Sequence, residues 1–207
     1  MIALLLFALS LAPAHGSSVL EAEHVRLSDD LEQLANRQLW PAVEKKFAEL
    51  QKLGVEMTYD DLVHGAYAAR AIGNMQQVYD RLRVAARIKG TREVVDWLAA
   101  IDANYGLVEL VTHNARGGEL VFVGELPFDP DQRGAVANAI ERVKRDGVFA
   151  GLLPRGEYRY AGQPFRVEPG IGVRIEVSPR LKKTTGELVN VSAGPIQPPS
   201  PEPTTDP

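Results

Sequence analysis

The sequence has no cysteine among its 207 residues. This absence excludes a disulfide framework, a cysteine nucleophile and a lipid-anchored N-terminus of the lipoprotein kind, because each of these needs a thiol. An apolar fraction of 45% with few aromatic residues is ordinary for a globular protein. The core must therefore be stabilised by packing alone.

Residues that carry chemistry are scarce and scattered. The four histidines stand at positions 15, 24, 64 and 113, in four different segments and without the i, i+4 spacing of a helical metal site. No Gly-x-Ser-x-Gly sequence and no glycine-rich phosphate loop before a helix occurs. The acidic pairs at 29–30 and 60–61 follow a serine and a threonine, and acids in the first turn of a helix explain them. We therefore predict a protein that is not an enzyme, with no catalytic, cofactor-binding or metal-binding residues.

A surplus of one charge sign is also lacking. The 23 basic and 27 acidic residues give a net charge of −4. A nucleic-acid-binding or anionic-membrane-binding surface usually needs a clear basic excess. We therefore expect no nucleic acid among the partners.

The one long apolar run covers residues 1–14 and is too short to span a bilayer. It ends in Ala12-Pro13-Ala14, a small-residue pattern typical of signal peptidase sites. We interpret it as a secretion signal that is cleaved after Ala14, so that the mature chain begins at His15. Because no Lys or Arg precedes the run, a short membrane anchor is the alternative interpretation.

Residues 31–89 read as two helical hairpins that follow a lead-in helix from about Val19. Sliding the chain by 32 residues superimposes apolar positions, such as Leu31 on Val63, Leu34 on Ala66, Ala35 on Tyr67, Val43 on Met75, Phe47 on Tyr79 and Leu50 on Leu82. A lone hairpin cannot bury its apolar face, so such repeats stack on one another. Helix boundaries are predicted at Pro41, Gly54, Thr58, Gly73-Asn74 and Gly90-Thr91. A fifth helix, near residues 92–103, should cap the stack.

This block resembles the tetratricopeptide family of helical repeats. The resemblance implies a stack whose first helices line a concave docking surface. Tyr67 and Arg70 lie on the first helix of the second repeat. We therefore expect these two residues to bind a partner.

From Asn104 the apolar period changes from that of a helix to that of strands. Asp129-Pro130 opens one helix, over residues 130–145, and strands are predicted at 148–153, 157–160, 163–167 and 172–178. In the last two strands the apolar residues Phe165, Val167, Val173, Ile175 and Val177 share one face. Arginines and glutamates take the other face, where we expect cross-strand ion pairs.

The segments VFVGELP at 121–127, LPRGEY at 153–158 and VEPG at 167–170 resemble the PEGA class of small β-sandwich domains. The resemblance implies a non-catalytic module of exported bacterial proteins. Residues 180–207 are rich in proline and poor in apolar residues, and we expect a disordered tail.

Together these patterns predict an α+β protein with a helical repeat domain at 19–103 and an antiparallel β-sandwich with one inserted helix at 104–179. We expect an exported, periplasmic or cell-surface scaffold or adaptor that binds a protein partner in a bacterial envelope assembly. No membrane-spanning segment is expected in the mature chain, and no sequence signal points to a particular oligomeric state. The alternative function is binding of envelope glycans or small ligands through Tyr158, Tyr160 and Gln163 of the β-domain.

Overall fold

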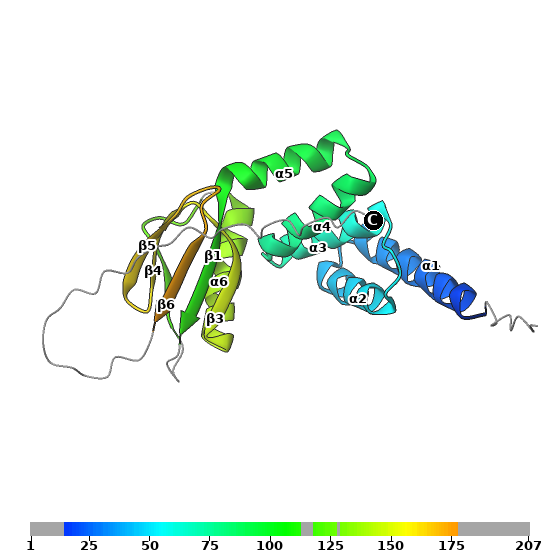
Figure 1. Ribbon diagram of the computed structural model, residues 1–207, viewed down its shortest axis with the longest axis horizontal. Helices are drawn as coiled ribbons and strands as arrows, with labels where there is room; N and C mark the ends of the chain where they lie inside the picture. Colours follow the sequence, from blue (N-terminus) through cyan, green and yellow to red (C-terminus); the bar gives the residue numbers. More distant parts are fainter. Residues whose placement is uncertain (1–14, 113–117, 128, 178–207) are drawn as a thin grey trace, which may run out of the picture.

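The computed structural model describes residues 15–112, 118–127 and 129–177, with side chains from residue 19 onward. The predicted secretion signal at 1–14 and the predicted tail at 180–207 lie outside these residues. Within them, five helices precede a β-rich region that contains a sixth helix (Figure 1). The predicted α+β class is confirmed.

The helical block consists of α1 (His15–Asn36), α2 (Trp40–Leu53), α3 (Tyr59–Ala71), α4 (Met75–Ile88) and α5 (Arg92–Asn104). Most predicted helix ends are confirmed: the side chains of Thr58, Asn74 and Thr91 each accept a backbone N–H of the helix that follows. Gly54 ends α2 in the left-handed region at φ 68°. This conformation suits glycine because it has no Cβ.

One predicted boundary is wrong. The lead-in helix from Val19 and the first repeat helix form the single helix α1, so Ser28 lies inside a helix and is no cap for Asp29 and Asp30. By contrast, Asp60 and Asp61 do lie in the first turn of α3. Apolar residues at Leu27 and Leu31 continue one buried stripe through Ser28, and this stripe keeps the helix intact.

The repeat in the structure has a length of 35 residues, because α4 begins and ends 35 residues after α2. The predicted offset of 32 was therefore wrong by three residues. At the true offset, buried residues superimpose on buried residues, namely Leu27 on Leu62, Leu31 on Ala66, Val43 on Val78, Phe47 on Leu82 and Leu50 on Ala85. Phe47 is 1% exposed as predicted, whereas Tyr79 is only half-buried and is not its equivalent.

A buried arginine joins three helices of the stack. Arg81 of α4 donates from Nη1 to Glu44 Oε2 of α2 at 2.6 Å and to the carbonyl oxygen of Gly65 in α3 at 2.5 Å. Its Nη2 donates to Glu44 Oε1 at 2.7 Å, and its guanidinium carbon lies 3.9 Å from the centre of the Phe47 ring. A Cβ at position 65 would collide with that ring, so only glycine fits there. Removal of one partner from such a buried pair typically costs about 3–5 kcal/mol.

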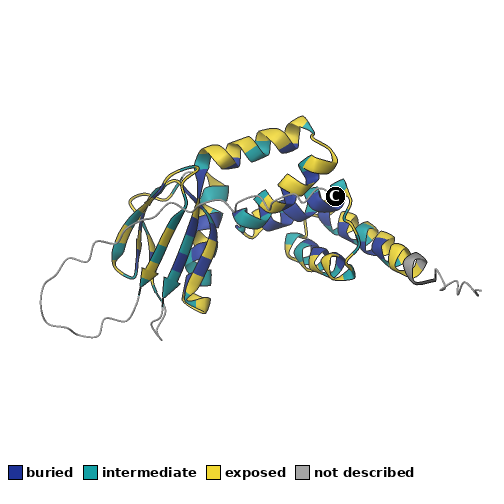
Figure 2. Ribbon diagram, in the orientation of Figure 1, coloured by how far each residue is buried: buried dark blue, intermediate teal, exposed yellow. Residues whose placement is uncertain are grey.

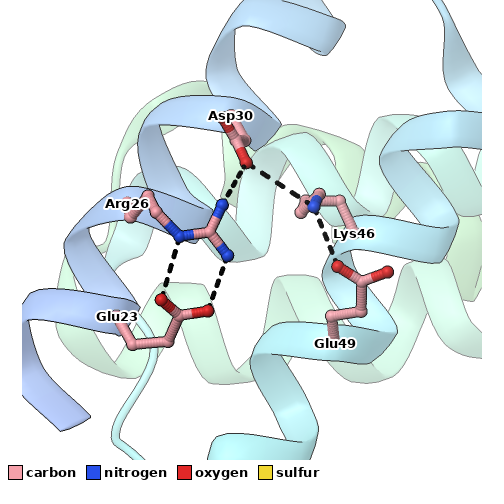
Figure 3. A network of polar contacts seen from close by, with 5 residues as sticks. All are labelled: Glu23, Arg26, Asp30, Lys46 and Glu49. Carbon is pink, nitrogen blue, oxygen red and sulfur yellow. Dashed lines mark hydrogen bonds and ion pairs between the residues drawn. The ribbon is translucent and has the colours of Figure 1, made fainter. Parts of the chain in front are cut away.

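A surface network joins α1 to α2 (Figure 3). Arg26 donates to Glu23 at 2.6 and 2.9 Å and to Asp30 at 3.1 Å. Lys46 of α2 lies 3.5 Å from Asp30 and 2.8 Å from Glu49. The hydrogen bond from Arg26 lowers the pKa of Glu23, and the one from Lys46 lowers the pKa of Glu49.

The β-rich region contains β1 (Tyr105–Thr112), β2 (Leu120–Val123), α6 (Pro130–Asp146), β3 (Val148–Pro154), β4 (Gly156–Tyr160), β5 (Gln163–Val167) and β6 (Val173–Val177). The strands form two three-stranded sheets, ordered β3-β1-β6 and β2-β4-β5. A turn at Ala161-Gly162 joins β4 and β5, which match two predicted strands, as an antiparallel hairpin. The strand β6 does not continue this sheet but pairs parallel to β1.

The core of the β-region lies between the two sheets and α6. Tyr158 and Tyr160 of β4 are its largest side chains, and both are 0% exposed. Val136, Ala139 and Val143 of α6 pack against the same cluster. The helix contacts β3 in one sheet and β2 in the other, so it covers the open edge between them.

The helical block and the β-region share a third apolar cluster. Tyr105 of β1, Ala135 of α6 and Leu152 of β3 pack with residues of α3, α4 and α5 in this cluster. The Asn138 amide of α6 donates to the carbonyl oxygen of Ile72 at 2.9 Å. Because β1 starts directly after α5 without a connecting loop, the two parts are held in a fixed relation (Figure 1).

Candidate functional site

A groove of about 310 Å³ lies where the helical block meets the β-region. We call it the junction groove. Its wall on the helical side comes from α3, α4 and α5, and its wall on the other side from the start of β1 and the first turn of α6. The lining residues are Tyr67, Arg70, Met75, Glu93, Trp97, Ala100, Ile101, Asn104, Tyr105, Asp129, Asp131 and Gln132.

Three aromatic side chains form a continuous ridge: Tyr67 and Trp97 line the groove, and Trp40 extends the ridge beyond it. Tyr67 stands in the middle, with its ring centre 6.1 Å from that of Trp40 and 5.0 Å from that of Trp97. The three residues come from α2, α3 and α5, and each is half-buried. Trp40 and Trp97 are the two tryptophans of the chain. The ridge is therefore a large aromatic surface that is only partly covered.

Helix α5 forms one side of the groove because only one of its faces is covered. Val94 and Ile101 are buried against the stack, and most of the remaining surface of the helix is exposed (Figure 2). This arrangement presents Trp97 and Glu93 beside Tyr67. The Tyr67 hydroxyl donates to Glu93 Oε1 at 2.7 Å. That hydrogen bond, together with burial, raises the pKa of Tyr67.

Arg70 connects the helical stack to the β-region across the groove. Its Nε and Nη2 both lie 2.7 Å from Asp131 Oδ2 of α6. The hydrogen bond to Asp131 raises the pKa of Arg70, while partial burial opposes the shift. The guanidinium carbon also lies 5.5 Å from the ring centre of Trp97, which is within the range of a cation–π contact.

The groove is acidic overall. Three carboxylates, of Glu93, Asp129 and Asp131, face one guanidinium, that of Arg70, which leaves a formal charge of −2. Asp129 Oδ1 caps α6 by accepting the backbone N–H groups of Asp131 and Gln132. Burial raises the pKa of Tyr105 at the floor of the groove, and the nearby charges of Asp129 and Asp131 add to this shift.

Each of these carboxylates keeps one oxygen without a hydrogen bond from any described residue. These oxygens are Oε2 of Glu93, Oδ2 of Asp129 and Oδ1 of Asp131. No group of three or more His, Asp or Glu residues in the described ranges is arranged to hold a metal ion.

The structure places both predicted partner-binding residues, Tyr67 and Arg70, in the junction groove. Sequence reasoning missed Trp97, Glu93 and Asp131. It assigned their helices to capping the stack and to the β-domain, and it gave no sign that α5 and α6 approach α3. The signal that could have helped was the pair of tryptophans, Trp40 and Trp97, in a chain with few aromatic residues.

Tyr158 and Tyr160, the residues that suggested a glycan-binding surface, do not face solvent. Their hydroxyls donate to the carbonyl oxygens of Pro154 at 2.8 Å and Gly147 at 3.0 Å inside the core. Among the described helices, none is long and apolar enough to cross a bilayer. The chain matches no protein-family model, no curated protein and no solved structure, so the two family resemblances stay predictions.

Proposed function

We propose that the protein is a non-enzymatic, exported scaffold or adaptor of a bacterial envelope assembly, and that its partner protein docks in the junction groove. The observation that carries this proposal is the half-buried aromatic ridge of Trp40, Tyr67 and Trp97. Tyrosine and tryptophan are enriched at protein interfaces because they combine a large apolar surface with a polar end.

The fixed relation of the two parts supports the same function. The groove takes its walls from both parts, and the shared apolar cluster around Tyr105 and Ala135 holds these walls together. A preformed site loses less entropy on binding than one that must be assembled.

The proposal also includes the export signal and the two family assignments, tetratricopeptide-like for the helical block and PEGA-like for the β-region. Sequencing of the mature N-terminus from envelope-purified protein checks export, and it should begin at His15.

The test compares two double variants that remove the same residue types. Tyr67→Ala with Arg70→Ala should weaken capture of the crosslinked envelope partner and lower the thermal midpoint by only a few degrees, because exposed ion pairs contribute about 1 kcal/mol or less. Tyr79→Ala with Arg83→Ala is the matched control on α4, where Arg83 lies 5.6 Å from the Tyr79 ring centre. The control should capture the partner normally.

Two results would contradict the proposal. If the Tyr67 and Arg70 variant unfolds, Tyr67 is a core residue and the docking surface is wrong. If it stays folded and captures the partner as the parent does, docking does not use the junction groove. A photo-crosslinking residue at Ala100, which lines the groove, gives an independent readout and should form an adduct with the same partner. The same residue at Glu157 of the β-region should not.

A further inference from the structure

The charge of the junction groove selects among possible partner segments. Its lining carries a formal charge of −2, and three carboxylate oxygens are left without a hydrogen bond from the described residues. An acidic peptide would meet repulsion along the whole groove, whereas a basic one would find an acceptor for each cation. Charge complementarity therefore favours a basic segment.

Arg70 shows which cation the groove suits. Its guanidinium lies over Trp97 at 5.5 Å and at the same time contacts Asp131 at 2.7 Å. A guanidinium can do both because it is planar and carries several donors, while an ammonium is a compact point charge. The open oxygens of Glu93 and Asp129 stand beside the same aromatic ridge, so they offer a second guanidinium the same combination of contacts.

The walls of the groove also favour one backbone conformation of the partner. Most of their residues come from helices, and among the described residues β1 contributes only Tyr105, so the groove offers a peptide backbone little strand to pair with. A polyproline II segment needs no such pairing, because its backbone groups remain solvated and its rings pack on aromatic side chains. The ridge from Trp97 through Tyr67 to Trp40 supplies those side chains.

We propose that the junction groove binds an extended segment of the partner protein that contains arginine and proline, with an arginine of this segment against Trp97 and bound by Glu93 and Asp129. This inference rests on the proposed function, since it names the chemistry of the docking partner. The prolines pack along the aromatic ridge.

The test uses a synthetic peptide, acetyl-Pro-Arg-Pro-Pro-Arg-Pro-amide, with the full chain. Both tryptophans of the chain lie on the ridge, so intrinsic tryptophan fluorescence reports on the site without a label. The peptide should change this fluorescence saturably, and added salt should weaken its binding. The same peptide with citrulline in place of arginine keeps the shape and loses the charge. It should bind about tenfold more weakly or worse, because charge-assisted hydrogen bonds are lost.

Two conservative substitutions remove the charge and keep the local structure. Glu93→Gln retains an oxygen for the Tyr67 hydroxyl, and Asp129→Asn retains a residue that caps helices equally well. The double variant should melt with the parent and bind the arginine peptide about tenfold more weakly. Glu157→Gln with Glu168→Gln makes the same charge change elsewhere on the β-region and should bind as the parent does.

Several outcomes would overturn the inference. They are equal binding of the arginine and citrulline peptides, unchanged binding by the Glu93 and Asp129 variant, or equal weakening by the control variant. If Ala100 crosslinks to a partner while the peptides fail to bind, docking in the groove stands and only the cationic class is wrong. If the combined substitutions Arg180→Ser, Lys182→Ser and Lys183→Ser tighten peptide binding, the chain's own basic segment competes for the groove and the inference of an external partner fails.

Discussion

Arg81 determines how α2, α3 and α4 fit together. Its guanidinium is shared between Glu44 and the carbonyl oxygen of Gly65, and its face covers Phe47. A lysine could not replace it, because an ammonium group cannot form a bidentate pair with a carboxylate and also cover an aromatic ring. The buried Arg81 thus joins three helices, and the Phe47 ring that it covers leaves room only for glycine at position 65.

Phe47→Ala tests this arrangement at the level of one residue. The ring is 1% exposed, so its removal should cost about 3–5 kcal/mol of unfolding free energy, measured by urea denaturation. Tyr79→Ala is the control and should cost clearly less, since Tyr79 is half-buried. A Phe47→Ala variant that loses less than about 1 kcal/mol would show that the surrounding helices collapse onto the vacated space.

The apolar core residues were predictable from sequence, and the buried polar residues were not. Leu31, Val43, Phe47 and Leu50 follow the helical period and all are buried. Arg81 can be buried because Glu44 pairs with it, and Glu44 lies 37 residues earlier in the chain. No local pattern reports a contact over such a distance. The same reason hid the contact of Arg70 with Asp131, 61 residues later.

Among the helices, the error in repeat length has a simple geometric origin. A shift of three residues turns a helix by roughly 300°, so an apolar stripe lands almost on itself. Apolar periodicity therefore could not distinguish an offset of 32 from the true 35. The caps at Thr58, Asn74 and Thr91 locate the helices more sharply, because a cap occupies one position only.

Among the strands, the sequence predicted which face is buried, but it did not predict which strand pairs with β6. Phe165, Val167, Ile175 and Val177 pack against the core of the β-region, and their alternation in the sequence predicts this. Alternation does not say which strand lies alongside, and β6 pairs with β1 in the other sheet. Its Arg174 consequently meets Glu109 of β1 at 3.3 Å, an ion pair that no short-range pattern contains.

The network between α1 and α2 should make stability depend on pH in the acid range. The pKa of Glu23 is lowered from its usual value of 4.5 by the bond from Arg26, so its contribution is complete above that value and is lost as pH falls through the lowered pKa. An Arg26→Gln variant should accordingly be less stable than the parent near neutral pH, and the difference should shrink below about pH 4.

Thermal melts of both proteins from pH 7 to pH 3 measure this difference. Arg37→Gln serves as the control, because Arg37 is exposed and forms no ion pair with a described residue. It should differ little from the parent at every pH. An Arg26→Gln difference that is equally large at pH 3 and pH 7 would mean that Arg26 stabilises the helices through packing instead of charge.

For the whole molecule, the predicted independence of residues 104–179 is the main open test. The β-region keeps its own core around Val108, Tyr158 and Tyr160, and this core contains no residue of α1 to α5. The fragment should therefore fold with a strand-dominated circular dichroism spectrum and one helix. It should melt below the full chain, because Tyr105, Ala135 and Leu152 lose the helical residues they pack against. A disordered fragment would show that the shared cluster is indispensable.

The parallel pairing of β1 with β6 has a mechanical consequence. A pull applied between the helical block and a point beyond Val177 acts on β1 at Tyr105 and on β6 at its opposite end. The two strands are then dragged lengthwise past each other, and the pairs from Val108 with Val173 to Thr112 with Val177 are strained together. Such a shearing geometry resists tension more strongly than a hairpin that opens one pair at a time, so β1 and β6 should separate only at high force when the chain is pulled in this direction.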